Sequence, residues 1–457
     1  MRIFNLYYPP RTLLLLGGEL TVICASFLLA TLIRFGQDSY LVLGYEYGLY
    51  KILAVTGFAL FFGYSFDLYD LQRLQSRGEF IFRMLAAVGA LSLFTAAISY
   101  LFPQVDPGNG VLLTGLCILA VALIGWRSAY GWLIGRPYLR ERVYVLGAGE
   151  RANWLVENLR INKYLGLDVV GWAGANNNVS PTREELANML LSLKDSRAVD
   201  RVIVAMSDRR STMPIRELLE LRMANIKVEN AADLLEKVSG KIEVDGLNPS
   251  WLVFSEGFGL SSAFLLAQRL ISFVVAFVCL VLVLPITPLI ALAIKLTSPG
   301  SILYRQKRVG RSGVMFNCYK FRTMSIDAEA DKGPTWASDD DPRITRVGHW
   351  LRITRLDEIP QLWNVLRGDM SFCGPRPERP EFVDWLTTEI PYYHLRHVIR
   401  PGITGWAQIR YKYGNSVEDA KEKLRYDLYY IKNISLGFDL MIIFETLKVV
   451  ALGRGAR

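Results

Sequence analysis

Residues 356–377 read LDEIPQLWNVLRGDMSFCGPRP, and this stretch guides the interpretation of the whole chain. It opens with the adjacent acids Asp357 and Glu358, continues through a short apolar helix and ends in a Gly-Pro-Arg-Pro turn. The basic residues that precede it are Lys320, Arg322, Arg352 and Arg355. Carboxylates set among cations suit phosphoryl chemistry, which needs a group that attacks phosphorus or holds a metal and groups that carry phosphate charge.

The acidic pair has two interpretations. Pro360 in a first turn, with acids at its start, is typical of a helix N-terminus, where acids usually cap the helix and interact with its dipole. A helix N-terminus also lowers the pKa of a carboxylate and binds phosphate oxygens, which suits a nucleophile. Because neighbouring residues on a helix do not face the same way, we expect two separate roles for Asp357 and Glu358.

The composition predicts a membrane protein. The chain has 457 residues, of which 51% are hydrophobic, and this length allows two or three domains. The net charge of +9 does not indicate nucleic-acid binding, because the basic residues flank apolar segments, as cytoplasmic anchors do. The five cysteines show no C-x-x-C spacing, so neither disulfides nor a zinc site is expected.

Four apolar segments lie within residues 1–135, and each approaches the roughly 20 residues of a transmembrane helix. They cover about residues 13–33, 49–66, 84–102 and 111–126, the last continuing to residue 134. Arginines follow the second and fourth segments, whereas the loop 103–110 has no basic residue. This asymmetry predicts that both ends of the bundle are cytoplasmic, although Arg34 and Lys51 fall on the opposite side.

Residues 142–240 form a polar α/β segment. Strands are predicted over 143–146, 169–172 and 202–205, with helices over 183–193 and 215–224, which favours a doubly wound parallel sheet. Gly147 and Gly149 would let the backbone approach a phosphate at a helix N-terminus. Residues 173–176 offer no acid for a ribose hydroxyl, so a structural or regulatory role is favoured over dinucleotide chemistry.

Residues 270–296 are apolar apart from Lys295, but Pro285 and Pro288 interrupt them. Proline breaks or kinks a helix, and basic residues flank both ends of this segment. A re-entrant helix that enters and leaves one leaflet satisfies both observations. The alternative is a kinked helix that crosses the membrane.

Residues 356–377, together with YKFRTM at 319–324 and RPGITGWAQ at 400–408, resemble the catalytic core of the bacterial monotopic phosphoglycosyl transferases, the bacterial sugar transferase family. The resemblance covers about residues 268–457. It implies a re-entrant membrane helix at 268–298 and an α/β-type catalytic domain at 299–457. The four-helix transmembrane bundle and a Rossmann-like domain at 142–240 are similar to the front end of the larger members.

The resemblance implies transfer of hexose-1-phosphate from a UDP-sugar to undecaprenyl phosphate, with release of UMP, as the first step of exopolysaccharide or O-antigen assembly. Asp357 would be the nucleophile that forms an aspartyl-phosphosugar and would also bind Mg²⁺, while Glu358 would assist. Substrate binding is expected from Lys320, Arg322, Arg352, Arg376, Arg400, Gln408 and Asp427. Turn geometry alone would also explain the prolines around Arg376 and the glycines of residues 400–408.

Two other functions are the alternatives. A membrane-bound nucleotide-sugar dehydratase or epimerase would need a second glycine-rich nucleotide fold and a Tyr-x-x-x-Lys pair, and Tyr304 and Lys307 are only three apart. A non-catalytic assembly scaffold is disfavoured by the intact acidic pair.

Residues 424–452 predict a C-terminal helix at the membrane interface or facing the core. The expected location is the bacterial inner membrane with the catalytic domain in the cytoplasm, in contact with lipid, and the resemblance favours a homodimer.

Overall fold

The computed structural model describes residues 2–3, 6–7, 10–69, 77–103, 108–136, 139–162, 165–174, 182–196, 198–206, 213–245, 252, 255, 257–325, 341–411, 414 and 416–451. The chain forms two compact units, residues 8–231 and residues 232–457, the second joined by residues 2–7. These N-terminal residues form a short antiparallel pair, β1 (Arg2–Ile3) and β2 (Leu6–Tyr7). The bounds of the four predicted domains, residues 1–135, 142–240, 268–298 and 299–457, stay predictions.

The first unit begins with long apolar helices. They are α1 (Pro10–Phe35), α3 (Gly48–Ser65), α4 (Arg77–Leu101) and α5 (Asn109–Ile134). They confirm the four predicted helical segments; η1 (Gly36–Asp38) and α2 (Ser39–Gly44), which follow α1, were not predicted. Phe27, Met84 and Leu119 are each only 1% exposed in their shared core, whereas Val121 on an outer face is 74% exposed. Apolar outer faces are expected where helices contact lipid.

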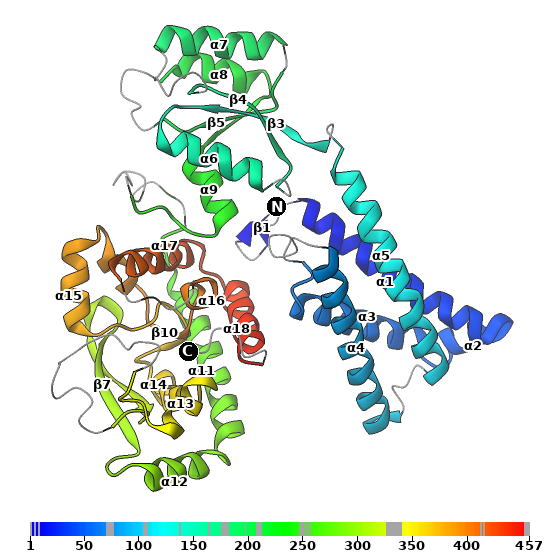
Figure 1. The fold of residues 1–457 in the computed structure, drawn as a ribbon, viewed down its shortest axis with the longest axis vertical. Coiled ribbons are helices and arrows are strands. Elements are labelled where there is room, and N and C mark those ends of the chain that lie inside the picture. The colour runs from blue at the N-terminus through cyan, green and yellow to red at the C-terminus, as the bar shows by residue number, and fades with distance from the viewer. Residues whose placement is uncertain are drawn as a thin grey trace. The chain divides into compact units, whose positions relative to one another are not determined.

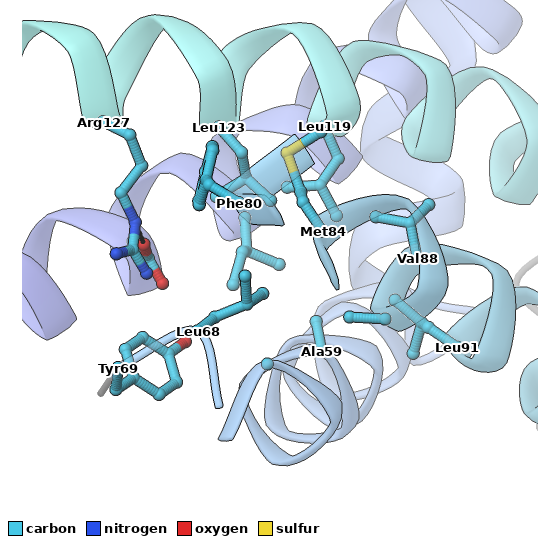
Figure 2. Close-up of a pocket in the computed structure, with 14 residues that line it drawn as sticks. Ala59, Leu68, Tyr69, Phe80, Met84, Val88, Leu91, Leu119, Leu123 and Arg127 are labelled. Atoms are coloured by element: carbon cyan, nitrogen blue, oxygen red, sulfur yellow. Dashed lines mark hydrogen bonds and ion pairs between the residues drawn. The ribbon is translucent and has the colours of Figure 1, made fainter. Parts of the chain in front are cut away.

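A pocket among these helices has one polar end. Figure 2 shows Arg127 and Tyr69 at that end and Val88 and Leu91 at the other. Arg127 pairs with Glu19, which is buried, and its guanidinium lies 5.5 Å from the centre of the Tyr69 ring. An isolated buried charge is costly, so this pairing of α1 with α5 allows both charges to be accommodated between apolar helices.

A four-stranded parallel sheet of order β4-β3-β5-β6 completes the first unit. Its strands are β3 (Glu141–Leu146), β4 (Leu167–Trp172), β5 (Arg201–Val204) and β6 (Lys227–Asn230). Helices α7 (Arg183–Ser196) and α8 (Ile215–Met223) cover one face, and α6 (Glu150–Ile161) covers the other (Figure 1). The predicted strands and helices are confirmed to within a few residues, and β6 is additional. This part is a mixed α/β domain; its Rossmann-like assignment stays a prediction.

The second unit starts with α9 (Ala231–Ser239) and contains two further two-stranded sheets. Strands β7 (Leu303–Val309) and β8 (Met315–Phe321) are antiparallel, with η5 (Arg311–Gly313) between them, whereas β9 (Ser371–Cys373) and β10 (Gly402–Thr404) are parallel. From residue 346 onward, the described helices are α13 (Arg346–Ile353), η6 (Leu356–Glu358), α14 (Gln361–Arg367), α15 (Pro380–Glu389), η7 (Tyr393–His397), α16 (Trp406–Arg410), α17 (Val417–Asn433) and α18 (Leu436–Ala451).

The proline-containing apolar segment is divided into α11 (Ser262–Val283) and α12 (Thr287–Thr297). Pro285 lies in the gap between them, and Pro288 lies in the first turn of α12, where its missing N–H leaves no hydrogen bond unmade. The predicted interruption is therefore confirmed.

Both halves of the broken helix belong to the second unit and pack on its other helices. Ala276 of α11 contacts a cluster that includes Val365 of α14, and Ile294 of α12 contacts one that includes Leu351 of α13. By length and composition, five described segments can cross a membrane: Pro10–Gly44, Gly48–Ser65, Gly78–Leu101, Gly110–Ile134 and Ser262–Val283. The chain is thus a membrane protein, and α12 is too short to cross a membrane by itself.

The predicted C-terminal helix over 424–452 was wrong as a single element. It is divided between α17 and α18, with Ile434 and Ser435 outside both helices. Leu428, Tyr429 and Tyr430 of α17 are buried, so this part faces the core rather than the membrane interface.

Candidate active site

The acidic pair lies in η6, a 3-10 turn that ends two residues before α14 begins. The expectation that the acids lie at the start of that helix therefore needs correction: they lie in a separate turn. Arg355, just before this turn, has a φ of +57° in the left-handed region. Asp357 and Glu358 are each 8% exposed, which is low for carboxylates. Their ionisation therefore depends on the groups around them.

Asn364 of α14 fixes the position of this turn against β8. Its side-chain oxygen accepts a hydrogen bond from the Tyr319 N–H at 3.1 Å, and its amide nitrogen donates to the Asn317 carbonyl at 2.7 Å. Because Lys320 follows Tyr319 on β8, these contacts hold Lys320 beside the acidic pair. Sequence reasoning missed Asn364, although a polar residue within the apolar run Leu362–Leu366 signals a specific buried contact.

The two carboxylates have different partners. Lys320 Nζ lies 3.1 Å from Glu358 Oε1 and 4.0 Å from Asp357 Oδ2. Arg376 Nη2 lies 2.6 Å from the same Glu358 oxygen. Within the described part of the chain, the Asp357 carboxylate accepts no hydrogen bond. Glu358 is thus anchored by two cations, while Asp357 keeps its oxygens available.

The pKa values of the pair are pushed apart. Burial opposes ionisation of Glu358, but the charges of Arg376 and Lys320 outweigh it and lower the pKa of Glu358. Burial raises the pKa of Asp357; Lys320 acts against this shift and Glu358 adds to it. Burial and the nearby cations thus make Glu358 the more acidic and Asp357 the more basic of the two carboxylates.

The turn that carries Arg376 is held by close backbone packing of β9 against β10. A Cβ at Gly402 would lie 2.2 Å from the Gly374 nitrogen, so only glycine permits this approach. The contact brings α16, which follows β10, beside the turn. Arg376 Nη1 donates to Gln408 Oε1 at 2.9 Å, while its Nη2 holds Glu358. The predicted residues Arg376 and Gln408 therefore join the acidic pair.

A buried ion pair supports the same turn from behind. Arg396 of η7 lies 2.9 Å from Asp427 of α17 and donates to the Arg376 carbonyl at 3.1 Å. Burial raises the pKa of Asp427 to about 6, with Arg396 acting in the opposite direction. Asp427 therefore lies in the layer behind Arg376. Arg396 was not predicted, and only its packing against Asp427 identifies it.

Three predicted basic residues do not contact the pair. Arg322 donates to the carbonyl and hydroxyl of Ser298 at 2.9 and 2.8 Å, at the end of α12. Arg352 donates to Thr323 Oγ1 at 3.0 Å, yet its charge still acts to lower the pKa of Asp357. Arg400 lies near two other arginines, and burial together with their charges lowers its pKa.

The site fits a Mg²⁺ ion of the kind held partly by substrate. Mg²⁺ typically binds one or two carboxylates, phosphate oxygens and several waters. Asp357 supplies an available carboxylate, and Glu358 is the next nearest acid, although two cations already hold it. No cluster of three His, Cys, Asp or Glu residues suited to a metal occurs among the described residues. This pattern fits an ion bound by Asp357 with substrate better than an all-protein metal site.

Comparison with known proteins places this site in a family context. The family model "Bacterial sugar transferase" matches residues 263–453. The chain is 32% identical to the UDP-glucose:undecaprenyl-phosphate glucose-1-phosphate transferase of Escherichia coli K12, over 78% of each chain. It is 29% identical to the Xanthomonas campestris protein of the same name, over 97% of this chain and 94% of that one.

A further relative is the UDP-N-acetylgalactosamine-undecaprenyl-phosphate N-acetylgalactosaminephosphotransferase of Aeromonas hydrophila. It is 40% identical over 53% of this chain and 56% of its own length. Residues 263–453, which the family model matches, contain the acidic pair, Lys320, Arg376 and Gln408. The chain belongs to the bacterial sugar transferase family, a family of membrane enzymes.

Proposed function

We propose that this enzyme transfers hexose-1-phosphate from a UDP-sugar to undecaprenyl phosphate and releases UMP, as the initiating step of exopolysaccharide or O-antigen assembly. The observation that carries the proposal is that two adjacent carboxylates differ in their ion-pair partners and in the direction of their pKa shifts. Glu358 is held by Lys320 and Arg376, whereas Asp357 is buried, available and more basic. A transferase with a covalent intermediate needs such a nucleophile beside cations.

In the first step, an Asp357 oxygen attacks the phosphorus that bears the sugar. The bond from this phosphorus to the bridging oxygen breaks, and UMP leaves with that oxygen and its electron pair. The product on the enzyme is an aspartyl-phosphosugar, a mixed anhydride. Lys320 and Arg376 lie where they can stabilise the charge that develops on the phosphate oxygens.

In the second step, a phosphate oxygen of undecaprenyl phosphate attacks the same phosphorus. The bond to Asp357 breaks, the carboxylate is regenerated and a lipid-linked diphosphosugar forms. Although burial opposes its ionisation, Glu358 has a pKa lowered by Arg376 and Lys320, and it would hold both cations in place. Asp357 would be the residue that holds Mg²⁺ when the donor binds, and the ion would supply charge neutralisation for the phosphate oxygens before Asp357 reacts.

The membrane arrangement proposed for this chemistry keeps the active site at the cytoplasmic face of the inner membrane. Helices α11 and α12 would form a re-entrant element in one leaflet, since α11 packs on α14 and α12 packs on α13, both close to the site. Lipid would then surround the acceptor, and the donor would arrive from the cytoplasm. A Rossmann-like module in the first unit and a homodimer complete the proposal.

The test uses the full-length protein in lipid nanodiscs with Mg²⁺, undecaprenyl phosphate and, in turn, UDP-glucose, UDP-galactose and UDP-N-acetylhexosamines. We expect UMP release that requires both the acceptor and one of these donors. Release of UDP, or turnover of NAD(H) without UMP, would contradict the proposal. The same donor series identifies the sugar.

The raised pKa of Asp357 predicts how activity depends on pH. Protonated Asp357 cannot attack, so kcat/KM should fall on acidification at a pH above the 3.8 of an ordinary aspartate. Lys320 acts to lower this pKa, so Lys320→Gln should move the acidic limb to higher pH. A kcat/KM profile for each protein, normalised to its own maximum, measures this shift. An unchanged limb, or a shift to lower pH, would show that Asp357 does not control it.

A further inference from the structure

Residues 232–245, here called the strap, pack on the catalytic unit although they precede its matched residues 263–453. The Trp406 indole N–H donates to the Gly240 carbonyl at 2.8 Å. The Ile242 N–H donates to the Arg425 carbonyl of α17 at 3.0 Å. Ile242 and Val244 are each 3% exposed, so the strap buries apolar surface against this unit rather than lying over it loosely.

Ion pairs reinforce the attachment of the strap to α17. Lys432 lies 2.6 Å from Glu236, and both side chains are at least nine-tenths buried. Lys241 lies 2.6 Å from Glu422, and Arg425 lies 2.9 Å from Glu243. Because acids of the strap pair with cations of α17 and a lysine of the strap pairs with an acid of α17, these pairs favour one register of the strap on α17.

Trp406 connects the strap to the active site. It is the first residue of α16, is 3% exposed and packs edge-on against Phe438 with ring centres 5.1 Å apart. Gln408, two residues later, accepts from Arg376, which holds Glu358. Thus Trp406 at the start of α16 contacts the strap, while Gln408 in the same turn contacts the cation that anchors the acidic pair.

We infer that the strap positions Arg376 for catalysis through Trp406 and Gln408, and that Gly240 and Trp406 are positioning residues of this enzyme. The inference rests on the proposed function. Gly240 has a φ of +64°, and a Cβ there would lie 3.2 Å from the Trp406 ring. A side chain at position 240 would therefore strain the strap and push it from α16. Gly259 is a matched glycine, because a Cβ added there would meet no atom within 4 Å and its φ is not in the left-handed region.

The test is a double-substitution cycle in the full-length enzyme, with UMP release as the assay. Trp406→Phe keeps the ring but removes the hydrogen bond, and should lower kcat/KM about three- to tenfold, as expected for one lost hydrogen bond. In a Gln408→Leu background, where the connection to Arg376 is already lost, the same change should cost less than about twofold. A purely structural role would lower thermal stability but would reduce kcat/KM by the same factor in both backgrounds.

Gly240→Ala gives an independent readout, since it changes a residue of the strap and no residue of α16. It should lower kcat/KM in the Gln408-containing enzyme, while Gly259→Ala should match the unsubstituted enzyme. Equal factors for Trp406→Phe in both backgrounds, or equal activities of the two glycine variants, would overturn the inference. Absence of UMP release from the unsubstituted enzyme would instead reject the proposed function.

Discussion

Asp357→Asn should abolish UMP release, lowering the rate by roughly a thousandfold or more, as losses of nucleophiles do. The amide has nearly the shape of the carboxylate but is a poor nucleophile, so the aspartyl-phosphosugar cannot form. The measurement is UMP release in nanodiscs at saturating donor and acceptor. In parallel, the enzyme mixed with donor labelled in the sugar-bearing phosphate should yield a labelled peptide containing residue 357, and the variant should yield none.

The same substitution should leave the fold intact or slightly more stable. The folded-state pKa of Asp357 is raised, so its ionised form is disfavoured on folding, and this cost is present at pH values above the folded-state pKa. A neutral amide removes the cost. Thermal unfolding at neutral pH should therefore show an unchanged or higher midpoint. Asp384→Asn, at an exposed position of α15, serves as the matched control and should keep full activity. Substantial activity in Asp357→Asn would reject the covalent route through this carboxylate.

Arg376→Lys should lower kcat/KM about 10- to 100-fold, corresponding to roughly 1.4–2.7 kcal/mol. The guanidinium of Arg376 donates with one nitrogen to Glu358 and with the other to Gln408. A lysine ammonium is a single point charge and cannot span both acceptors in this geometry. The loss should therefore exceed that expected from charge alone, which lysine preserves. Steady-state rates over a UDP-sugar series provide the measurement.

The control for this substitution is Arg367→Lys at the end of α14. The Arg367 side chain is 53% exposed and lies 3.7 Å from Asp369, so its exchange should change kcat/KM little. If Arg376→Lys behaved like Arg367→Lys, the forked contact would have no catalytic importance. Full activity with any side chain at position 376 that has a positive charge but cannot contact both Glu358 and Gln408 would lead to the same conclusion.

Much of the local structure could be predicted from the sequence. The four apolar helices of the first unit follow from apolar runs of sufficient length, and the alternation of strands and helices around Gly147 follows from local periodicity. The gap between α11 and α12 follows from Pro285 and Pro288, because proline acts on its own backbone. The failure at the C-terminus was also local: no proline marks the end of α17 near Ile434, and Gly437 lies inside α18.

The partners of the acidic pair could not be predicted in the same way. Lys320 lies on β8 and Arg322 directly follows the end of that strand, yet Lys320 contacts Glu358 and Arg322 contacts Ser298. Contacts such as those of Asn364 hold the β8 backbone against α14, which places Lys320 beside Glu358. The chain then reaches the end of α12, where Arg322 contacts Ser298. Sequence spacing contains no information about these long-range contacts.

From the sequence, Asp357 and Glu358 could be identified as the expected acids of the site, because the run around them resembles the catalytic core of the family. Folding is what gives the two carboxylates different surroundings. Burial of both, with Lys320 and Arg376 converging on Glu358, separates their pKa values and leaves Asp357 available. The physical reason is that a carboxylate's basicity depends on its desolvation and on the charges within a few ångströms, and folding sets both.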